Sequence, residues 1–135
     1  MADCLFCKIV AGELAATIVA ESELALAFAD INPATPGHTL VIPRAHAQDV
    51  QDVTASDLRA TTELAQQVAR AAFERLGADG VNLLNSSGAL AGQTVFHFHI
   101  HVIPRYDGDS MRPSWVPSPG DPDQIAAAAA ALRGA

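Results

Sequence analysis

The fold is indicated most clearly by one stretch of eleven residues, Gln93-Thr94-Val95-Phe96-His97-Phe98-His99-Ile100-His101-Val102-Ile103. Side chains alternate between the two faces of a β-strand, so a strand over 94–103 places the three histidines on one face. Neighbouring imidazoles would lie roughly 6.6 Å apart, from a rise of about 3.3 Å per residue. The phenylalanines and aliphatic residues point the other way and predict a core face.

Three interpretations of the histidine face are open. It could be an exposed polar surface, a three-histidine metal site as in zinc hydrolases, or a site of phosphoryl chemistry with one histidine as nucleophile. The segment before it, 88–94, is rich in small residues, which let backbone N–H groups approach an anion. A Walker loop is excluded because its lysine is absent. The combination favours phosphoryl chemistry.

The remaining pattern predicts short strands around a long helix. Further strands are expected over 17–20, 24–29, 38–42 and 81–84, separated by turn-forming residues. Most links between them are short, which favours an α+β fold with an antiparallel sheet over alternating βαβ units.

Three helices are expected from their end signals. They are a short helix over 4–11 capped by Asp3 and ended by Gly12, a long helix from the cap Thr54 to Gly77, and a last helix capped by Asp121 with Pro122 at its first position. On the long helix, an apolar stripe predicts the core face: Leu58, Ala65, Val68, Ala72 and Leu76.

Composition narrows the possible partners. The 135 residues fit a single domain, and the net charge of −7 with one lysine, Lys8, argues against binding a nucleic-acid polymer. The longest apolar run, 125–132, is far shorter than the about 20 residues that span a bilayer, so no membrane partner is expected. The first residues show no secretory signal, and we expect a cytoplasmic protein.

The histidine stretch resembles the signature of the histidine triad (HIT) superfamily, written His-φ-His-φ-His-φ-φ with φ apolar. Asn85 and the pair Gly92-Gln93 match the residues before that signature, and the segments 4–10, 27–31 and 36–43 resemble the Hint-like branch. The resemblance covers about residues 3–106 of a single domain over 1–135, and leaves 107–135 as an extended tail with a C-terminal helix. It implies an α+β fold whose antiparallel sheet continues across a homodimer.

The resemblance also implies a chemistry, nucleotidyl transfer or hydrolysis at an α-phosphate. His99 would attack phosphorus and form a nucleotidyl-histidine intermediate, which fits an imidazole that is neutral near pH 7. His101 would donate to a phosphate oxygen, His38 would support the triad from behind, and Thr94 would lie near the leaving group.

The implied substrate is a purine nucleotide. Gly92 and Gln93 would line its phosphate, Asp30 would accept from the ribose hydroxyls, and Asn85 would hold the ribose-phosphate end. An apolar slot for the base would consist of Phe6, Ile9, Phe28 and Ile31. Core packing is the alternative for each of these four apolar residues.

The pair Cys4 and Cys7 forms a CxxC motif, with both sulfurs one helical turn apart. Metal binding, redox chemistry and simple packing are all open, although the redox interpretation lacks a thioredoxin-like context. Some HIT relatives and the related galactose-phosphate uridylyltransferases place zinc on two cysteines, an intervening histidine and the first triad histidine. Cys4, Cys7, His46 and His97 match that set, which would make a closed structural zinc site.

The expected function is that of a nucleoside phosphoramidase, which releases AMP from an AMP–amine. The alternatives are a dinucleoside polyphosphate hydrolase, a nucleotide-binding interaction module with little turnover, and a metal-dependent hydrolase that uses the three histidines. The uridylyltransferase reaction is not expected, because that family has proline where Phe98 stands. The resemblance also implies that the tail with Trp115 crosses toward the partner in a homodimer and borders the nucleotide site.

Overall fold

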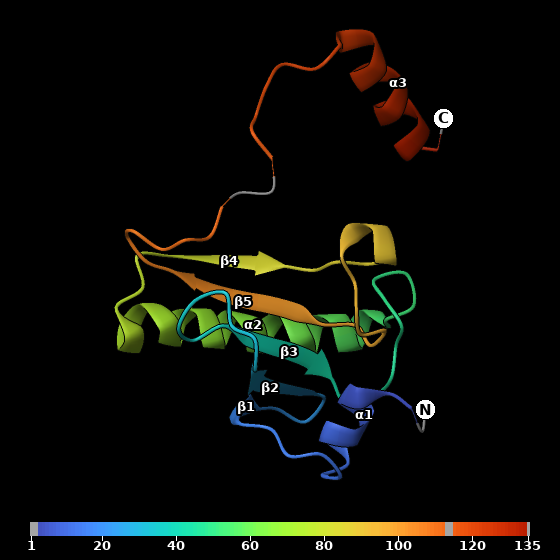
Figure 1. The fold of residues 1–135 in the computed structure, drawn as a ribbon. Helices are drawn as coiled ribbons and strands as arrows, with labels where there is room; N and C mark the ends of the chain where they lie inside the picture. The colour runs from blue at the N-terminus through green and yellow to red at the C-terminus, as the bar shows by residue number, and fades with distance from the viewer. Residues whose placement is uncertain (1–2, 113–114, 135) are drawn as a thin grey trace.

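A five-stranded antiparallel sheet organises the computed structural model, which describes residues 3–112 and 115–134 (Figure 1). The strands are β1 (Ile18–Glu21), β2 (Ala25–Ala29), β3 (Thr39–Pro43), β4 (Gly80–Leu84) and β5 (Ile100–Arg105). Their order across the sheet is β1-β2-β3-β5-β4, and every neighbouring pair is antiparallel. The predicted α+β class is confirmed.

One face of the sheet is covered by the long helix α2 (Ala55–Leu76) (Figure 1). Its ends are as predicted, because the Thr54 side chain accepts from the Asp57 N–H and Gly77 adopts a left-handed conformation with φ of 67°. The apolar stripe is shifted slightly from the prediction. Leu64 belongs to the core, whereas Leu76 is 51% exposed at the C-terminal end of the helix.

The other face of the sheet is covered by the short helix α1 (Leu5–Val10). Phe6 from this helix packs with alternate residues of β2 and β3, such as Phe28 and Leu40, while the intervening residues pack toward α2. Both strands are therefore buried on both faces, with the exception of partly buried Ala29 at the end of β2. This position in the middle of two layers explains their almost continuous apolar sequence.

The N-terminal cap of α1 differs from the prediction. Cys4 occupies the cap position, and its Sγ accepts from the Cys7 N–H at 3.3 Å. Cap preferences favour Asp over Cys, so Asp3 was the expected cap. The difference places Cys4 and Cys7 side by side at the start of the helix.

The predicted strand over 94–103 is wrong in its first half. The chain bends at residues 95–97, β5 begins only at Ile100, and a 3-10 helix, η1 (Ala89–Ala91), precedes the bend. The alternation nevertheless holds from His97 onward, because Phe98, Ile100 and Val102 are buried in the core under α2. Phe96 lies before that alternation and is 43% exposed, so its predicted core position is also wrong.

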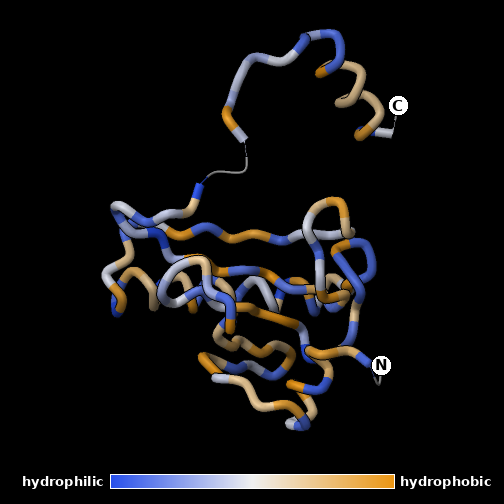
Figure 2. Tube along the Cα trace, in the orientation of Figure 1, coloured by the Kyte–Doolittle hydropathy of each residue, from blue (hydrophilic) through white to orange (hydrophobic). Residues whose placement is uncertain are grey.

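The tail leaves the body at the end of β5 and leads to helix α3 (Pro122–Leu132), which lies apart from the sheet (Figure 1). Asp121 accepts from the Gln124 N–H and Pro122 stands in the first turn, as predicted. No described residue of α3 is buried, although its colouring is largely hydrophobic (Figure 2).

The start of the tail is held firmly to the sheet. Arg105 makes two hydrogen bonds to the Asp109 carboxylate, at 2.8 and 2.9 Å, and a third to Asn82. The Tyr106 hydroxyl donates to the Pro36 carbonyl at 2.7 Å. Within residues 3–112 and 115–134, no helix has the length and apolar character that crossing a bilayer requires.

Candidate functional site

A pocket of about 600 Å³ opens between α1, the end of β2 and the histidine segment. It contains most of the residues that the sequence singled out for nucleotide binding: Phe6, Ile9, Phe28, Asp30, Ile31, Gly92, Thr94, His99 and His101. Three others, His38, Asn85 and Gln93, lie outside its lining. The lining also contains residues that were not predicted: Leu5, Leu14, Ala15, Ala16, Ala29, Asn32, Leu40 and Val95. Residues 14–16 carry no pattern that points to a ligand, because they belong to the irregular link after α1.

His99 is buried with its two ring nitrogens in different environments. Nδ1 lies 2.7 Å from the His97 carbonyl oxygen, which can only accept, so Nδ1 carries the proton. Nε2 therefore keeps a lone pair, and the described residues offer it no hydrogen-bond partner. Burial is the main cause that lowers the pKa of His99, which favours the neutral ring. A neutral imidazole with a free lone pair is able to attack an electrophile in the pocket.

His101 has the opposite arrangement of protons. His38 Nδ1 accepts from the Ala34 N–H at 2.9 Å, so His38 Nε2 carries the proton and donates to His101 Nδ1 at 2.9 Å. His101 must then carry its own proton on Nε2, in the pocket wall. Burial, with smaller contributions from His99 and His38, lowers the pKa of His101 to about 4. His101 is thus a neutral hydrogen-bond donor.

Asp30 lies 3.5 Å from His38 Nε2 and lines the pocket. Burial lowers the pKa of His38 more than Asp30 raises it, so the contact is a polar one to a neutral ring and not an ion pair. Asp30, His38 and His101 also satisfy the distances of a three-ligand metal group. The hydrogen bond between the two histidines already occupies the facing nitrogens, which argues against a metal there.

Gln93 and Asn85 hold the backbone around the pocket. The buried Gln93 side chain accepts from the Gly88 N–H at 2.8 Å and donates to the Gln48 and Val95 carbonyls at 2.7 and 3.1 Å. Asn85 Nδ2 donates to the His99 carbonyl at 2.9 Å. Gln93 stands in the sequence between two pocket residues, Gly92 and Thr94, and no sequence pattern distinguishes such a supporting side chain from one that contacts a ligand.

The apolar slot combines core packing with a pocket wall. Phe6 and Phe28 are both buried and meet edge to face, with ring centroids 5.3 Å apart, and both line the pocket. The alternatives that the sequence left open for these residues are therefore compatible. Ile31 is different, because it is 91% exposed and forms only the rim.

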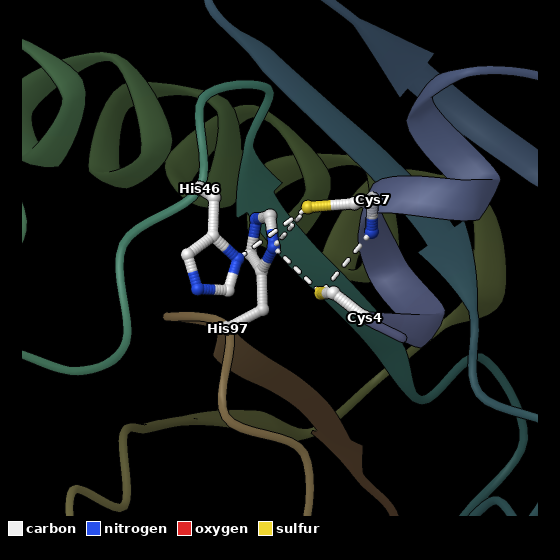
Figure 3. Close-up of side chains that lie close together, drawn as sticks. All are labelled: Cys4, Cys7, His46 and His97. Carbon is white, nitrogen blue, oxygen red and sulfur yellow. Dashed lines mark hydrogen bonds between the residues drawn. The ribbon is translucent and has the colours of Figure 1, made fainter. Parts of the chain in front are cut away.

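Cys4, Cys7, His46 and His97 meet in a cluster beside the pocket (Figure 3). Sulfur and Nδ1 atoms lie 3.4 Å apart for Cys4 and His97, 3.4 Å for Cys7 and His46, and 3.5 Å for Cys7 and His97. Tetrahedral zinc with ordinary Zn–S and Zn–N bonds separates such atoms by roughly 3.6 Å. The donor set and its spacing therefore fit a tetrahedral zinc ion.

A hydrogen bond to the backbone orients the His97 ring for zinc binding. His97 Nε2 donates to the Pro43 carbonyl at 2.8 Å, so its Nδ1 lone pair faces the two sulfurs. Burial is the main cause that raises the pKa of Cys7 to about 11, so a metal ion would be needed to hold it as a thiolate.

The three triad histidines do not converge on one point. In the part of the chain that the structure describes, His97 joins the cysteine cluster, while His99 and His101 line the pocket. The predicted alternative of a three-histidine metal site is therefore wrong. The bend before β5 turns the His97 side chain toward α1.

Two curated relatives match most of the chain. Protein hit of Bacillus subtilis (strain 168) is 43% identical over 114 residues, which cover 84% of this chain and 79% of that protein. The adenylylsulfatase HINT3 of Arabidopsis thaliana is 38% identical over 109 residues, which cover 81% of this chain and 55% of that protein.

Solved structures share the fold over nearly the whole chain. A protein from Streptococcus mutans UA159 has a TM-score of 0.93 at 40% identity and covers 99% of this chain and 85% of its own. A Zn-bound histidine triad family protein from Mycobacterium smegmatis has a TM-score of 0.78 at 40% identity, with 98% and 97% covered. The family model described as the HIT domain matches residues 11–108, a span that contains both pocket histidines and His38 behind them, and the chain therefore belongs to the HIT family.

Proposed function

We propose that the protein hydrolyses purine nucleotide conjugates at the α-phosphate through a nucleotidyl-His99 intermediate, and that AMP–amine phosphoramidates are its preferred substrates. One observation carries the proposal. A histidine with a free Nε2 lone pair and a histidine with an Nε2–H stand side by side in the wall of one pocket, with ring centroids 5.1 Å apart. These are the nucleophile and the donor that displacement at phosphorus requires.

In the first step, His99 Nε2 forms a bond to phosphorus as the bond from phosphorus to the amine breaks. The amine takes up a proton from solvent and leaves. In the second step, water attacks the same phosphorus, gives up a proton to solvent, and the His99–phosphorus bond breaks, which releases AMP and restores the lone pair. The His101 Nε2–H would donate to a non-bridging phosphate oxygen in both steps, and the proton on His99 Nδ1 would stay there, donated to the His97 carbonyl.

The charges around the pocket favour an amine over a polyphosphate as leaving group. Among the described residues that line it there is no Lys or Arg, and Asp30 adds a carboxylate. Arg44 and Arg105 are paired with Glu21 and Asp109. A polyphosphate leaving group carries several negative charges and would need cationic partners, whereas a neutral or cationic amine does not.

Two other functions remain as alternatives. The first is hydrolysis of a dinucleoside polyphosphate, and the second is nucleotide binding with little turnover. The name of the Arabidopsis relative adds adenylyl sulfate as a conjugate worth testing, since it too joins a leaving group to an AMP α-phosphate.

The substrate panel that tests the proposal contains an AMP–amine, diadenosine tetraphosphate and adenylyl sulfate at equal concentration. The AMP–amine is expected to have the highest kcat/KM, at least about tenfold above diadenosine tetraphosphate, a difference of about 1.4 kcal/mol in transition-state stabilisation. Equal or reversed preference would contradict the proposed leaving group. Turnover of none of the three, with AMP binding intact, would favour the binding module.

We also assign the cysteine cluster to a structural zinc ion, held by Cys4, Cys7, His46 and His97. The geometry of the four donors and the similarity to the Zn-bound Mycobacterium smegmatis protein support this assignment. When bound, zinc would join α1 to the loop after β3 and to the histidine segment, and so contribute folding free energy. Brief treatment with EDTA should leave turnover unchanged if zinc takes no part at phosphorus.

A homodimer is the proposed assembly. β4 is an edge strand with Leu83 and Leu84 half exposed, and an uncovered edge of this kind favours pairing with another strand. The apolar helix α3 stands clear of its own sheet, so a second copy would provide the surface that it lacks.

A further inference from the structure

The link between β2 and β3, residues 31–37, holds the His38 ring in place. Its Ala34 N–H donates to His38 Nδ1 at 2.9 Å, and this hydrogen bond leaves His38 Nε2 to donate to His101. The His38 N–H in turn donates to the Thr35 carbonyl at 3.1 Å. The orientation of the His38 ring therefore depends on where the backbone of residues 34–35 lies.

This link contains no helix or strand, and two hydrogen bonds tie it to the rest of the protein. The Thr35 hydroxyl donates to the Pro104 carbonyl, and the Tyr106 hydroxyl donates to the Pro36 carbonyl at 2.7 Å. The other hydrogen bonds of residues 31–37 stay within 30–39. The two ties hold the link against the end of β5 (Figure 1).

Thr35 occupies a place that the sheet leaves open. The registered pairing of β3 with β5 ends at Thr39 and Val102, so Pro104 lies beyond the ladder on this side. The Thr35 hydroxyl supplies the hydrogen bond that β3 does not give to the Pro104 carbonyl. Because Thr35 is only 4% exposed, loss of its hydroxyl would leave a buried carbonyl without this partner.

Close packing at Gly37 seats the link on two elements. Gly37 has a φ of 91°, and a Cβ there would lie 2.5 Å from Leu76 Cδ1 and 3.2 Å from Pro104 Cγ. The backbone thus approaches the last residue of α2 and the end of β5 directly. Thr35 fixes the link from its buried side, and Tyr106 fixes it from the surface.

We propose that Thr35 is a positioning residue for the hydrogen-bond donor of the site. By fixing the link on β5, it keeps the Ala34 N–H on His38 Nδ1 and the His38 ring on His101. Thr35 does not line the pocket, so it acts through His38. The kinetic part of this inference rests on the proposed function, whereas the position of the Ala34 N–H does not.

Amide hydrogen exchange of the ligand-free protein measures the position of Ala34 directly. In Thr35→Val the Ala34 N–H should exchange about tenfold faster than in wild type, because the link opens more often. Thr35→Ser keeps the hydroxyl and should restore the wild-type rate. The Gly88 N–H, which donates to the Gln93 side chain in another loop, is the internal reference and should not change. An unchanged Ala34 rate in Thr35→Val, or equal acceleration at Gly88, would overturn the proposal.

Kinetics with a matched buried threonine separate positioning from stability. Thr61 is buried on α2, and its hydroxyl likewise donates to a backbone carbonyl, that of Asp57. Thr35→Val should lower kcat for an AMP–amine about tenfold while AMP affinity stays within about threefold. Thr61→Val should leave both unchanged. A similar loss of kcat in both variants, or in neither, would contradict the positioning role.

Two outcomes need a separate reading. If wild type turns over no nucleotide conjugate, the proposed function fails and the exchange measurement alone decides the role of Thr35. If Thr35→Val does not fold, Tyr106→Phe decides, because it removes the outer tie and leaves the buried contacts in place. Faster exchange at Ala34 in Tyr106→Phe, with Gly88 unchanged, would support the proposal, and an unchanged rate at Ala34 would overturn it.

Discussion

At the scale of single residues, the chemistry of the site depends on where each histidine carries its proton. The His97 carbonyl sets the tautomer of His99, and the Ala34 N–H sets those of His38 and His101. These partners are backbone groups, so no side-chain motif encodes them. The triad pattern identified the histidines, but only the folded chain shows that neighbouring members carry opposite protons.

Acid sensitivity follows from the burial of His101. The pKa of His101 is about 4 in the folded chain, against 6.5 for an unperturbed ring. Between these values the unfolded chain binds a proton that the folded chain does not. The free energy of unfolding should therefore decrease as the pH falls from about 6.5 to about 4, and this contribution is complete above 6.5.

Urea unfolding of wild type and His101→Gln at several pH values between 4 and 7 measures this effect. Glutamine offers His38 an acceptor and does not titrate, so the variant should lose stability less steeply in acid. Acid release of metal affects both proteins alike and cancels in the comparison. If the free energy of unfolding falls equally steeply with decreasing pH in both proteins, the argument that burial lowers the pKa of His101 is contradicted.

At the scale of elements, the cluster explains how a six-residue helix is held on the sheet. An isolated helix as short as α1 is unstable in water, so tertiary contacts must hold it. Phe6 supplies apolar packing against β2 and β3, and Cys4 and Cys7 supply two of the four cluster donors. Both the pocket wall and the metal cluster are thus built on the same short helix.

Cys4→Ser should remove the metal and lower the Tm while the helix cap is retained. Serine is a good cap residue, so a loss of stability in this variant reports the cluster. A ligand present at about 100 times its Kd adds about 2.7 kcal/mol to the free energy of unfolding. For a domain of this size, that loss corresponds to a decrease of roughly 10 °C in Tm.

Elemental analysis and thermal unfolding check this expectation, with Asp3→Asn as the matched control because Asp3 is exposed and not among the four donors. Wild type and the control should carry close to one zinc per chain. No zinc in reduced, unstripped wild-type protein would instead support two thiols without a metal.

Helix ends could be predicted from the sequence more accurately than strand ends. Both ends of α2 and the start of α3 could be predicted to within a residue, because the N-terminal caps act through contacts three residues apart. The strand over 94–103 could be predicted only in part, because a ladder needs a partner and β3 offers one no earlier than Ile100. β5 also continues past the predicted end to Arg105, since Pro104 lies beyond the registered pairing with β3 and is paired with β4 alone.

The candidate site, like the strands, could be predicted from the sequence only in part. His99, His101 and the four cluster residues lie in contiguous motifs or match the family pattern, and the structure brings each set together. The supporting roles of Gln93 and Asn85 depend on distant carbonyls, of Gln48 and His99, whose proximity is a property of the fold.

At the scale of the whole molecule, contacts within a single chain do not explain the position of the tail and its helix α3. The hydrogen bonds between Arg105 and Asp109 fix the first residues of the tail and thus the direction in which it leaves the sheet. In contrast, α3 buries none of its residues. Ile125 and Leu132 are well exposed on this helix. A second copy of the chain would cover them.

Truncation after Tyr106 should weaken the dimer and reduce the preference among substrates, measured by light scattering and by ratios of kcat/KM. Truncation after Arg112 keeps the pair of Arg105 and Asp109 and controls for damage to the sheet edge. The full-length double variant Ile125→Asp with Leu132→Asp should behave like the truncations, because buried charges oppose docking. A truncated protein with unchanged dimerisation and substrate preference would show that the tail has no such role.

The central claim is that His99 forms a covalent bond to the nucleotide, and trapping that intermediate tests it most directly. Wild type and His99→Ala are mixed with an AMP–amine, quenched within one turnover, and analysed by intact mass and peptide mapping. Wild type should carry one AMP group, on His99. His99→Ala should carry none and lose at least about 10³-fold in kcat, with AMP affinity within about threefold because the apolar slot and Asp30 remain. An AMP group on another residue, or near-normal kcat in His99→Ala, would contradict the account.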